Sequence, residues 1–227
     1  MCRSQAEGGR RCPSKLRRMP LSSFTPIESD TAPAVDWAAD QRNSPPAMFE
    51  RHPSSAAAAA MNRILEVRAR EVEITASMTE AADAAGAQLA GLDHRVKSPD
   101  STAGKISRKS QASYANPSEV ADQLSDLCRY TVASDPRGSL THTVGATAQQ
   151  LHAQGWEIVE FEHSYVDGNP YKGVHTVWRH PSGERVEVQF HTVQSLSAKE
   201  AGHRAYDTYR DSQAPPAERL IAYTASV

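Results

Sequence analysis

Four short motifs follow one another between residues 95 and 192 of this 227-residue chain. They are Arg95-Val96-Lys97-Ser98-Pro99-Asp100-Ser101 with Lys105 behind it, Asp126-Leu127-Cys128-Arg129, Tyr171-Lys172-Gly173-Val174-His175 and Glu187-Val188-Gln189-Phe190-His191-Thr192. Together they supply basic groups for a polyphosphate, two carboxylates for a metal ion and an aromatic ring for a nucleobase. These are the parts that a nucleotide-using phosphotransferase needs.

The first motif offers cations for a polyphosphate. Arg95 and Lys97 lie two positions apart in residues 92–97, which we predict to form a short strand, so both side chains are expected on one face. Ser101 is the predicted N-cap of a helix that carries Lys105 in its first turns. Because a helix N-terminus has free N–H groups, the arrangement favours a triphosphate site. A solvated basic loop is the alternative for this motif taken alone.

Two carboxylates fall on separate predicted strands. Asp126 begins an apolar strand, and Glu187 stands between two valines, so its side chain points away from theirs. Such a pair can hold Mg²⁺, which keeps several waters and bridges phosphate oxygens. Taken singly, each residue has a plainer interpretation, as an exposed edge glutamate or a helix-terminal aspartate.

The third motif offers a ring and a cation. Tyr171 follows the turn at residues 167–170 and is suited to stacking on a purine while Lys172 meets a phosphate. An ordinary tyrosine at the start of a strand is the alternative. The spacing of His163, His175, His191 and His203 matches no metal-ligand pattern, so we expect these to be satisfied or exposed side chains.

Bulk composition excludes several classes of protein. The net charge of −2 gives no global attraction for nucleic acid or for a membrane surface. No run approaches the roughly 18 apolar residues of a membrane helix. The three cysteines form no CxxC pair, which favours a reducing, cytoplasmic setting.

The chain divides into three parts by pattern. Residues 1–55 are rich in Ser, Pro, Arg and Ala and are predicted to be disordered. Residues 56–90 carry apolar residues at helical spacing and are predicted to form one long helix or a helical pair. Its alanine-rich stripe either caps the sheet or serves as a surface for a homo-oligomer or an antitoxin protein. Residues 91–227 are the predicted globular domain.

The domain alternates strands and helices. Strands are predicted at residues 92–97, 127–133, 156–165, 174–179 and 185–191, and helices after residue 101 and at 117–124, 141–154, 195–210 and 215–223. Pro181-Ser182-Gly183 joins the last two strands as a hairpin. The sequence therefore predicts an α/β fold with a mixed five-stranded sheet flanked by helices, whose last three strands form an antiparallel meander.

The four motifs, in this order and spacing, resemble the synthetase domain of RelA/SpoT-type alarmone enzymes, small stand-alone members included. A predicted helix with Glu200, His203 and Tyr206 follows them, and the resemblance covers residues 92–210. It implies a nucleotidyltransferase-like fold and a pyrophosphokinase. Such enzymes move the β,γ-diphosphate of ATP to the 3′-hydroxyl of an acceptor nucleotide and release AMP.

The resemblance also implies a role for each motif. The residues expected to hold ATP, with Arg129 stacking on it or neutralising it, are Arg95, Lys97, Ser101 and Lys105. Asp126 and Glu187 would bind Mg²⁺, Glu187 would also take the 3′-hydroxyl proton, and Gln189 would orient it. Tyr171 would stack on the acceptor base, and the residues near the acceptor phosphates would be Lys172, His175 and His191.

Three departures from the family pattern stand out. Asp126 and Arg129 are three positions apart rather than five, so Asp122 remains a second candidate for the metal ligand. Gly104 replaces a usual basic residue, and His191 replaces a usual arginine. The acceptor therefore stays open. GDP or GTP is favoured, and the alternatives are a toxin that makes (p)ppApp or pyrophosphorylates the tRNA 3′ end. An inactive nucleotide-binding protein is the alternative from another class.

Overall fold

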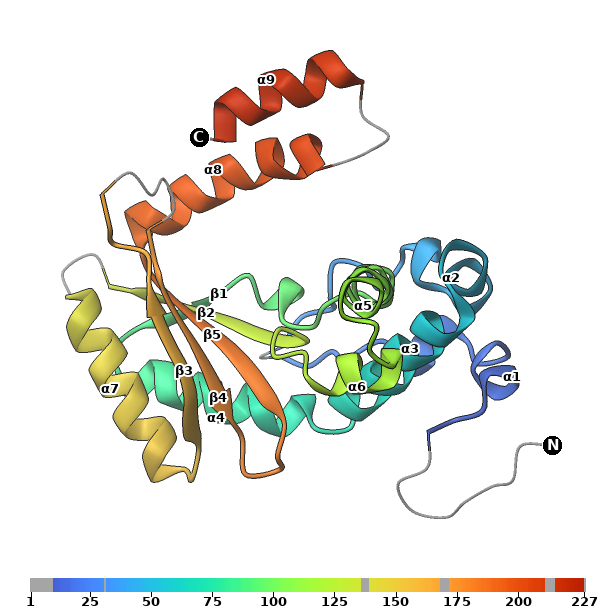
Figure 1. The fold of residues 1–227 in the computed structure, drawn as a ribbon. Helices are drawn as coiled ribbons and strands as arrows, with labels where there is room; N and C mark the ends of the chain where they lie inside the picture. Colours follow the sequence, from blue (N-terminus) through green and yellow to red (C-terminus); the bar gives the residue numbers. More distant parts are fainter. Residues whose placement is uncertain (1–9, 31, 136–138, 168–171, 211–214, 227) are drawn as a thin grey trace.

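One mixed sheet organises the chain (Figure 1). The computed structural model describes residues 10–30, 32–135, 139–167, 172–210 and 215–226. The strand order is β1-β2-β5-β4-β3, with β2 parallel to β5 and the other neighbours antiparallel. This is the mixed five-stranded sheet with a final meander that the sequence predicts. The strands are β1 (Gln88–Ala90), β2 (Cys128–Ser134), β3 (Glu157–His163), β4 (Val174–Arg179) and β5 (Arg185–Thr192).

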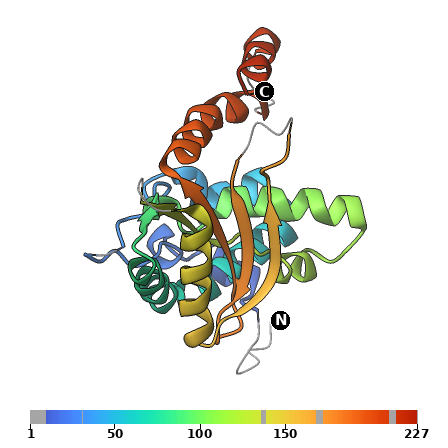
Figure 2. The same cartoon turned by 90° about the vertical axis from the view of Figure 1, so that its left-hand side faces the viewer.

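Helices flank this sheet and extend from one end of it. Helices α4 and α7 pack on each other and lie along one face, whereas α8 leaves the end of β5 and packs with α9 away from the sheet (Figures 1 and 2). No helix in the described ranges is both long and apolar enough to span a bilayer. The helices are α1 (Pro13–Leu16), α2 (Pro45–Arg51), α3 (Ser54–Arg68), α4 (Glu71–Ala84), α5 (Pro99–Ser113), α6 (Pro117–Asp122), α7 (Leu140–Ala153), α8 (Val193–Arg210) and α9 (Pro216–Ser226), with 3₁₀ turns η1 (Leu21–Ser23), η2 (Gln41–Asn43) and η3 (Leu92–His94).

Strand alternation gives the two central strands a buried and a half-buried side. Along β2 and β5 every second residue is buried, because successive side chains point to opposite faces. The hydroxyl of Tyr130 lies 2.7 Å from that of Thr75 on α4, so the buried side is the one that faces the helices. The buried apolar side chains on these two strands are Cys128, Tyr130, Val132, Val186, Val188 and Phe190.

The other side of the same strands is polar and open. The parallel register sets Arg129 beside Glu187 and Thr131 beside Gln189, and His175 of β4 lies opposite Gln189. These side chains are half-buried. The sheet therefore presents the chemistry-bearing residues of three strands on one face, while the opposite face anchors them in the core.

The structure orders most of the segment that the sequence predicts to be disordered. The indole Nε1 of Trp37 donates to the carbonyl of Val96 at 2.7 Å, and Arg68 donates to the carbonyls of Ser23 and Thr25. Residues 10–30 and 32–55 therefore pack on the domain, and the prediction of disorder is wrong for them. Proline stops helices without preventing apolar side chains from docking. The buried side chains of this segment include Leu16, Phe24, Trp37 and Met48.

The helical region at 56–90 is a helical pair, as predicted, and belongs to the core. Its alanines, Ala56–Ala60, are buried, and α3 packs against α5 and α6 of the same chain. Small side chains allow this close helix approach. The alanine stripe itself is therefore covered within the chain.

The segment predicted as a strand at 92–97 is instead a turn. Gly91 has a left-handed backbone (φ 61°) and ends β1, after which η3 runs to His94 and Arg95 is helical in φ and ψ. Val96 makes only an isolated bridge to Cys128. Because regular alternation fails here, Arg95 and Lys97 do not share a face.

Arg95 points into the core. Its side chain is fully buried and its Nε donates to the buried carboxylate of Glu71 on α4. Its guanidinium also donates to the carbonyls of Pro33 and Ile27. Arg95 thus ties the N-terminal segment to α4, and the expectation that it holds ATP is wrong.

His191 is a second site residue that the structure buries. Its Nδ1 lies 3.1 Å from Ser195 Oγ, and Ser195 and Thr192 exchange hydrogen bonds as the N-terminal cap of α8. Burial, aided by the charge of Lys199, lowers the pKa of His191 to about 4. His191 is therefore buried within the fold and is not placed for the expected contact with acceptor phosphates.

Arg95→Met is expected to lower the free energy of unfolding by about 3–5 kcal/mol, because it leaves the Glu71 carboxylate buried without its cation. The double variant Arg95→Met/Glu71→Leu removes both charges and should recover part of that loss. Urea unfolding followed by tryptophan fluorescence measures both. A fully stable Arg95→Met with a raised KM for ATP would instead make Arg95 a nucleotide ligand.

His191 should make the stability of the protein depend on pH. In the unfolded chain His191 is protonated below about pH 6.5, whereas in the folded chain it is protonated only below about pH 4. The free energy of unfolding therefore falls as the pH falls from about 6.5 to about 4. His191→Gln should flatten the curve of unfolding free energy against pH there. The exposed His142→Gln on α7 is the matched control, and equal slopes for wild type and His191→Gln would contradict the assignment.

Candidate nucleotide and metal site

Asp126 lies between two lysines at the start of β2. Its Oδ2 accepts from Lys97 Nζ at 3.0 Å and forms an ion pair with Lys105 Nζ at 2.7 Å. Burial alone would raise the pKa of Asp126, but the charge of Lys97 and the bonds from both lysines lower it to about 2. The carboxylate is therefore ionised at neutral pH.

Local structure fixes both lysines. The N–H of Lys97 donates to the carbonyl of Leu127 at 2.9 Å, which holds it beside Asp126. Ser98 caps α5 by accepting from the N–H of Ser101 at 3.2 Å, and Lys105 follows two turns later. The N-cap is thus Ser98 rather than Ser101, because Pro99 supplies the first helical position.

Glu187 is held from two sides. Gln189 Nε2 donates to Glu187 Oε1 at 2.9 Å, and His175 Nδ1 lies 3.3 Å from the same oxygen. Burial raises the pKa of Glu187, but the hydrogen bonds from His175 and Gln189 lower it overall. Glu187 and Asp126 line one pocket of about 240 Å³, with Lys105, Glu160 and Glu162 also on its wall.

The two carboxylates suit a magnesium ion. Oδ1 of Asp126 is buried and has no hydrogen-bond partner among the described residues. An ion with two carboxylate ligands, completed by water and phosphate oxygens, is the usual way that proteins hold Mg²⁺. The described residues contain no group of three or more His, Cys, Asp or Glu side chains placed for a metal. Asp122 lies apart on α6, paired with Arg10.

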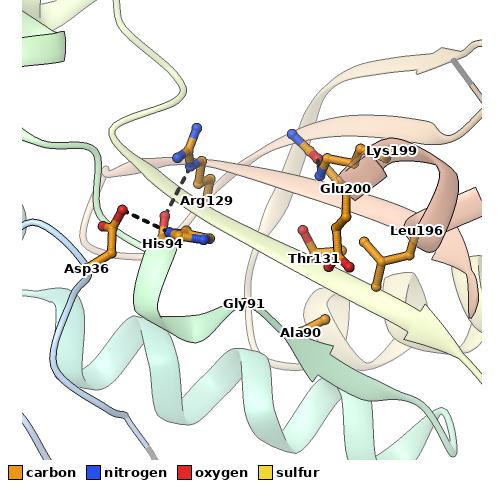
Figure 3. Close-up of a pocket in the computed structure, with 10 residues that line it drawn as sticks. Asp36, Ala90, Gly91, His94, Arg129, Thr131, Leu196, Lys199 and Glu200 are labelled. Carbon is orange, nitrogen blue, oxygen red and sulfur yellow. Dashed lines mark hydrogen bonds and ion pairs between the residues drawn. The ribbon is translucent and has the colours of Figure 1, made fainter. Parts of the chain in front are cut away.

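A larger pocket of about 510 Å³ adjoins the same strands (Figure 3). Arg129 and Lys199 bring positive charge to it from β2 and α8, and Gln189 forms part of its wall. On the other side, His94 Nδ1 and Asp36 Oδ2 pair at 3.2 Å, and Arg129 Nε donates to the carbonyl of His94 at 3.0 Å. The dimensions and charge suit a nucleotide.

The two pockets meet at neighbouring residues of β5. Gln189 lines the larger pocket and donates to Glu187, which lines the smaller one. A polyphosphate that extends from Arg129 toward Lys105 would pass this pair. The arrangement can hold two anionic groups on either side of one ionised carboxylate.

The structure gathers most of the predicted site and scatters the rest. Ser101 is exposed and lies in neither pocket, and Lys172 Nζ donates to the carbonyl of Val166 at 2.7 Å. Tyr171 and the side chains of His203 and Tyr206 lie outside the described residues. The predicted residues that come together are Lys97, Lys105, Asp126, Arg129, His175, Glu187 and Gln189.

Three titratable residues of the larger pocket have no counterpart in the motif analysis: Asp36, His94 and Lys199. Asp36 sits in a proline-rich stretch without periodicity, so no sequence signal marks it. Lys199 has a weak signal, since a helix that directly follows β5 must begin over the open face. His94 comes immediately before the first motif.

Comparison with known proteins gives one decisive match. The family model described as "Region found in RelA / SpoT proteins" matches residues 94–214, more than half of the chain. No curated protein matches the chain.

The solved structures that resemble this chain share little sequence identity with it. The type VI effector Tas1, in complex with its immunity protein, is 18% identical, with 75% of this chain and 91% of that chain covered and a TM-score of 0.41. Small alarmone synthetase 1 from Bacillus subtilis is 18% identical over 72% of this chain and 84% of that chain, with a TM-score of 0.46. A structure of the same synthetase bound to its product pppGpp is 15% identical over 58% and 70% of the two chains, with a TM-score of 0.39. On the family match, whose region contains both carboxylates and their lysines, this chain belongs to the RelA/SpoT family.

Proposed function

We propose that this protein is an ATP-dependent pyrophosphokinase that transfers the β,γ-diphosphate of ATP to the 3′-hydroxyl of a purine nucleotide. GDP or GTP is the favoured acceptor, so the products are AMP and a (p)ppGpp-like alarmone. The observation that carries the proposal is the placement of Asp126 and Glu187 in one pocket beside Lys105. Membership of the RelA/SpoT family supports the same reaction class.

The reaction needs positioning and charge neutralisation more than covalent chemistry. The acceptor 3′-oxygen attacks the β-phosphorus of ATP, the bond from that phosphorus to the oxygen bridging it to the α-phosphorus breaks, and AMP leaves. The hydroxyl proton goes to Glu187, which is ionised and oriented by Gln189 and His175.

The cations would hold the phosphates. Lys105 faces the carboxylate pocket, and Arg129 faces the larger one. Lys97 stays with Asp126 and keeps that carboxylate ionised. Mg²⁺ held by Asp126 and Glu187 would add neutralisation of charge on the transferred group.

Glu187→Gln should lower the rate of AMP release by roughly 10²–10⁴-fold, because it removes the proton acceptor and a metal ligand while keeping the shape of the side chain. The measurement is AMP formation from ATP with Mg²⁺ and GTP. Glu119→Gln, an exposed change on α6, is the control and should keep wild-type activity. Full activity in Glu187→Gln would sink the proposal, provided that both variants unfold at the same temperature.

An acceptor panel separates the branches of the proposal. Wild-type protein is incubated with γ-labelled ATP and Mg²⁺ in parallel with GDP, GTP, ADP, AMP or deacylated tRNA. We expect label on GDP or GTP. Label on adenine nucleotides or on tRNA would replace the favoured acceptor with one of the toxin-type acceptors. An ATP-dependent rise in melting temperature without product in any reaction would favour the inactive binding protein.

A further inference from the structure

A chain of hydrogen bonds joins α8 to the carboxylate pocket. Lys199 Nζ donates to Gln189 Oε1 at 2.6 Å, and Gln189 Nε2 donates to Glu187 Oε1 at 2.9 Å. His175 Nδ1 lies 3.3 Å from that same glutamate oxygen. Lys199 is thus connected to Glu187 through a single side-chain amide.

The chemistry of the amide makes Lys199 decisive for its orientation. The glutamine side chain has a donor end and an acceptor end, and the two can exchange by a 180° flip. An ammonium group has no acceptor, so Lys199 can bond only to the carbonyl oxygen. The NH₂ group is then left to face Glu187. The flipped amide would bring its oxygen against a carboxylate and an NH₂ group against a cation, and both contacts are repulsive.

The location of Lys199 gives this orientation a functional meaning. Lys199 and Gln189 line the larger pocket, whereas Glu187 lines the smaller one. Lys199 is half-buried, and its burial together with the charge of Arg129 lowers its pKa. Among the described residues no carboxylate forms an ion pair with this ammonium, and its hydrogen bond to Gln189 holds it in place.

We propose that Lys199 is a positioning residue, which locks the Gln189 amide so that its NH₂ group orients Glu187 toward the acceptor hydroxyl. The proposal rests on the pyrophosphokinase function and deepens it, because it names the group that couples the nucleotide pocket to the proton acceptor. A different role for Lys199, as a direct ligand of an ATP phosphate, makes the opposite kinetic predictions.

A double-mutant cycle separates the two roles. If Lys199 acts through Gln189, Lys199→Met should lower kcat about 10–100-fold with little change in the KM for ATP, as for other residues that orient a reacting group. Adding Lys199→Met to Gln189→Leu should cause no further loss.

Lys199→Arg keeps a donor and should restore part of the rate. Lys15→Met, an exposed change on α1, is the charge-matched control. Additive losses with a raised KM would overturn the proposal in favour of a phosphate ligand.

A second readout does not need turnover. The NMR resonances of the Gln189 side-chain NH₂ group can be assigned by their loss in Gln189→Leu. These amide protons should exchange with solvent slowly in the wild type and rapidly in Lys199→Met. Unchanged exchange in Lys199→Met would overturn the proposal whether or not the enzyme is active. A wild type that makes no product with any acceptor would instead count against the pyrophosphokinase function, while the NMR comparison would still decide the role of Lys199.

Discussion

The parallel pairing of β2 with β5 is the constraint on which the rest of the site depends. Its register places Arg129 beside Glu187 and Thr131 beside Gln189. A shift of one residue in the strand register would turn every side chain to the other face of the sheet. The buried residues that alternate with these polar residues therefore fix which face the polar side chains occupy. Val186 and Val188 are both fully buried, so the side chain of Glu187 between them points to the open face.

The polar face is stabilised by its own charges. Asp126 has two lysines and Glu187 has a histidine and an amide, so each carboxylate is satisfied on one oxygen. Removing one member would leave a half-buried charge without its partner, which costs more than the pair contributes. These contacts hold both carboxylates in position before any ligand enters.

Regular parts of this molecule could be predicted from sequence, and irregular parts could not. The strands at the meander and the helix at residues 140–153 follow hydrophobic periodicity, and the predicted pairs Asp126 with Glu187 and Glu187 with Gln189 are brought together. The predicted position of Arg95 is wrong because a left-handed Gly91 and a 3₁₀ turn break the alternation that would set it beside Lys97. Asp36 could not be found at all, since a proline-rich segment gives no periodic signal even when its apolar side chains dock.

A pyrophosphokinase moves two phosphates together to a nucleotide, and the fate of doubly labelled ATP shows whether they do so. Wild-type protein would be given ATP labelled at both the β- and γ-phosphates, with Mg²⁺ and GTP, and the products separated. We expect unlabelled AMP and an acceptor that carries both labels in equal amounts, as joint transfer requires. An acceptor carrying the γ-label alone, with labelled ADP as the second product, would contradict it and make the protein an ordinary kinase.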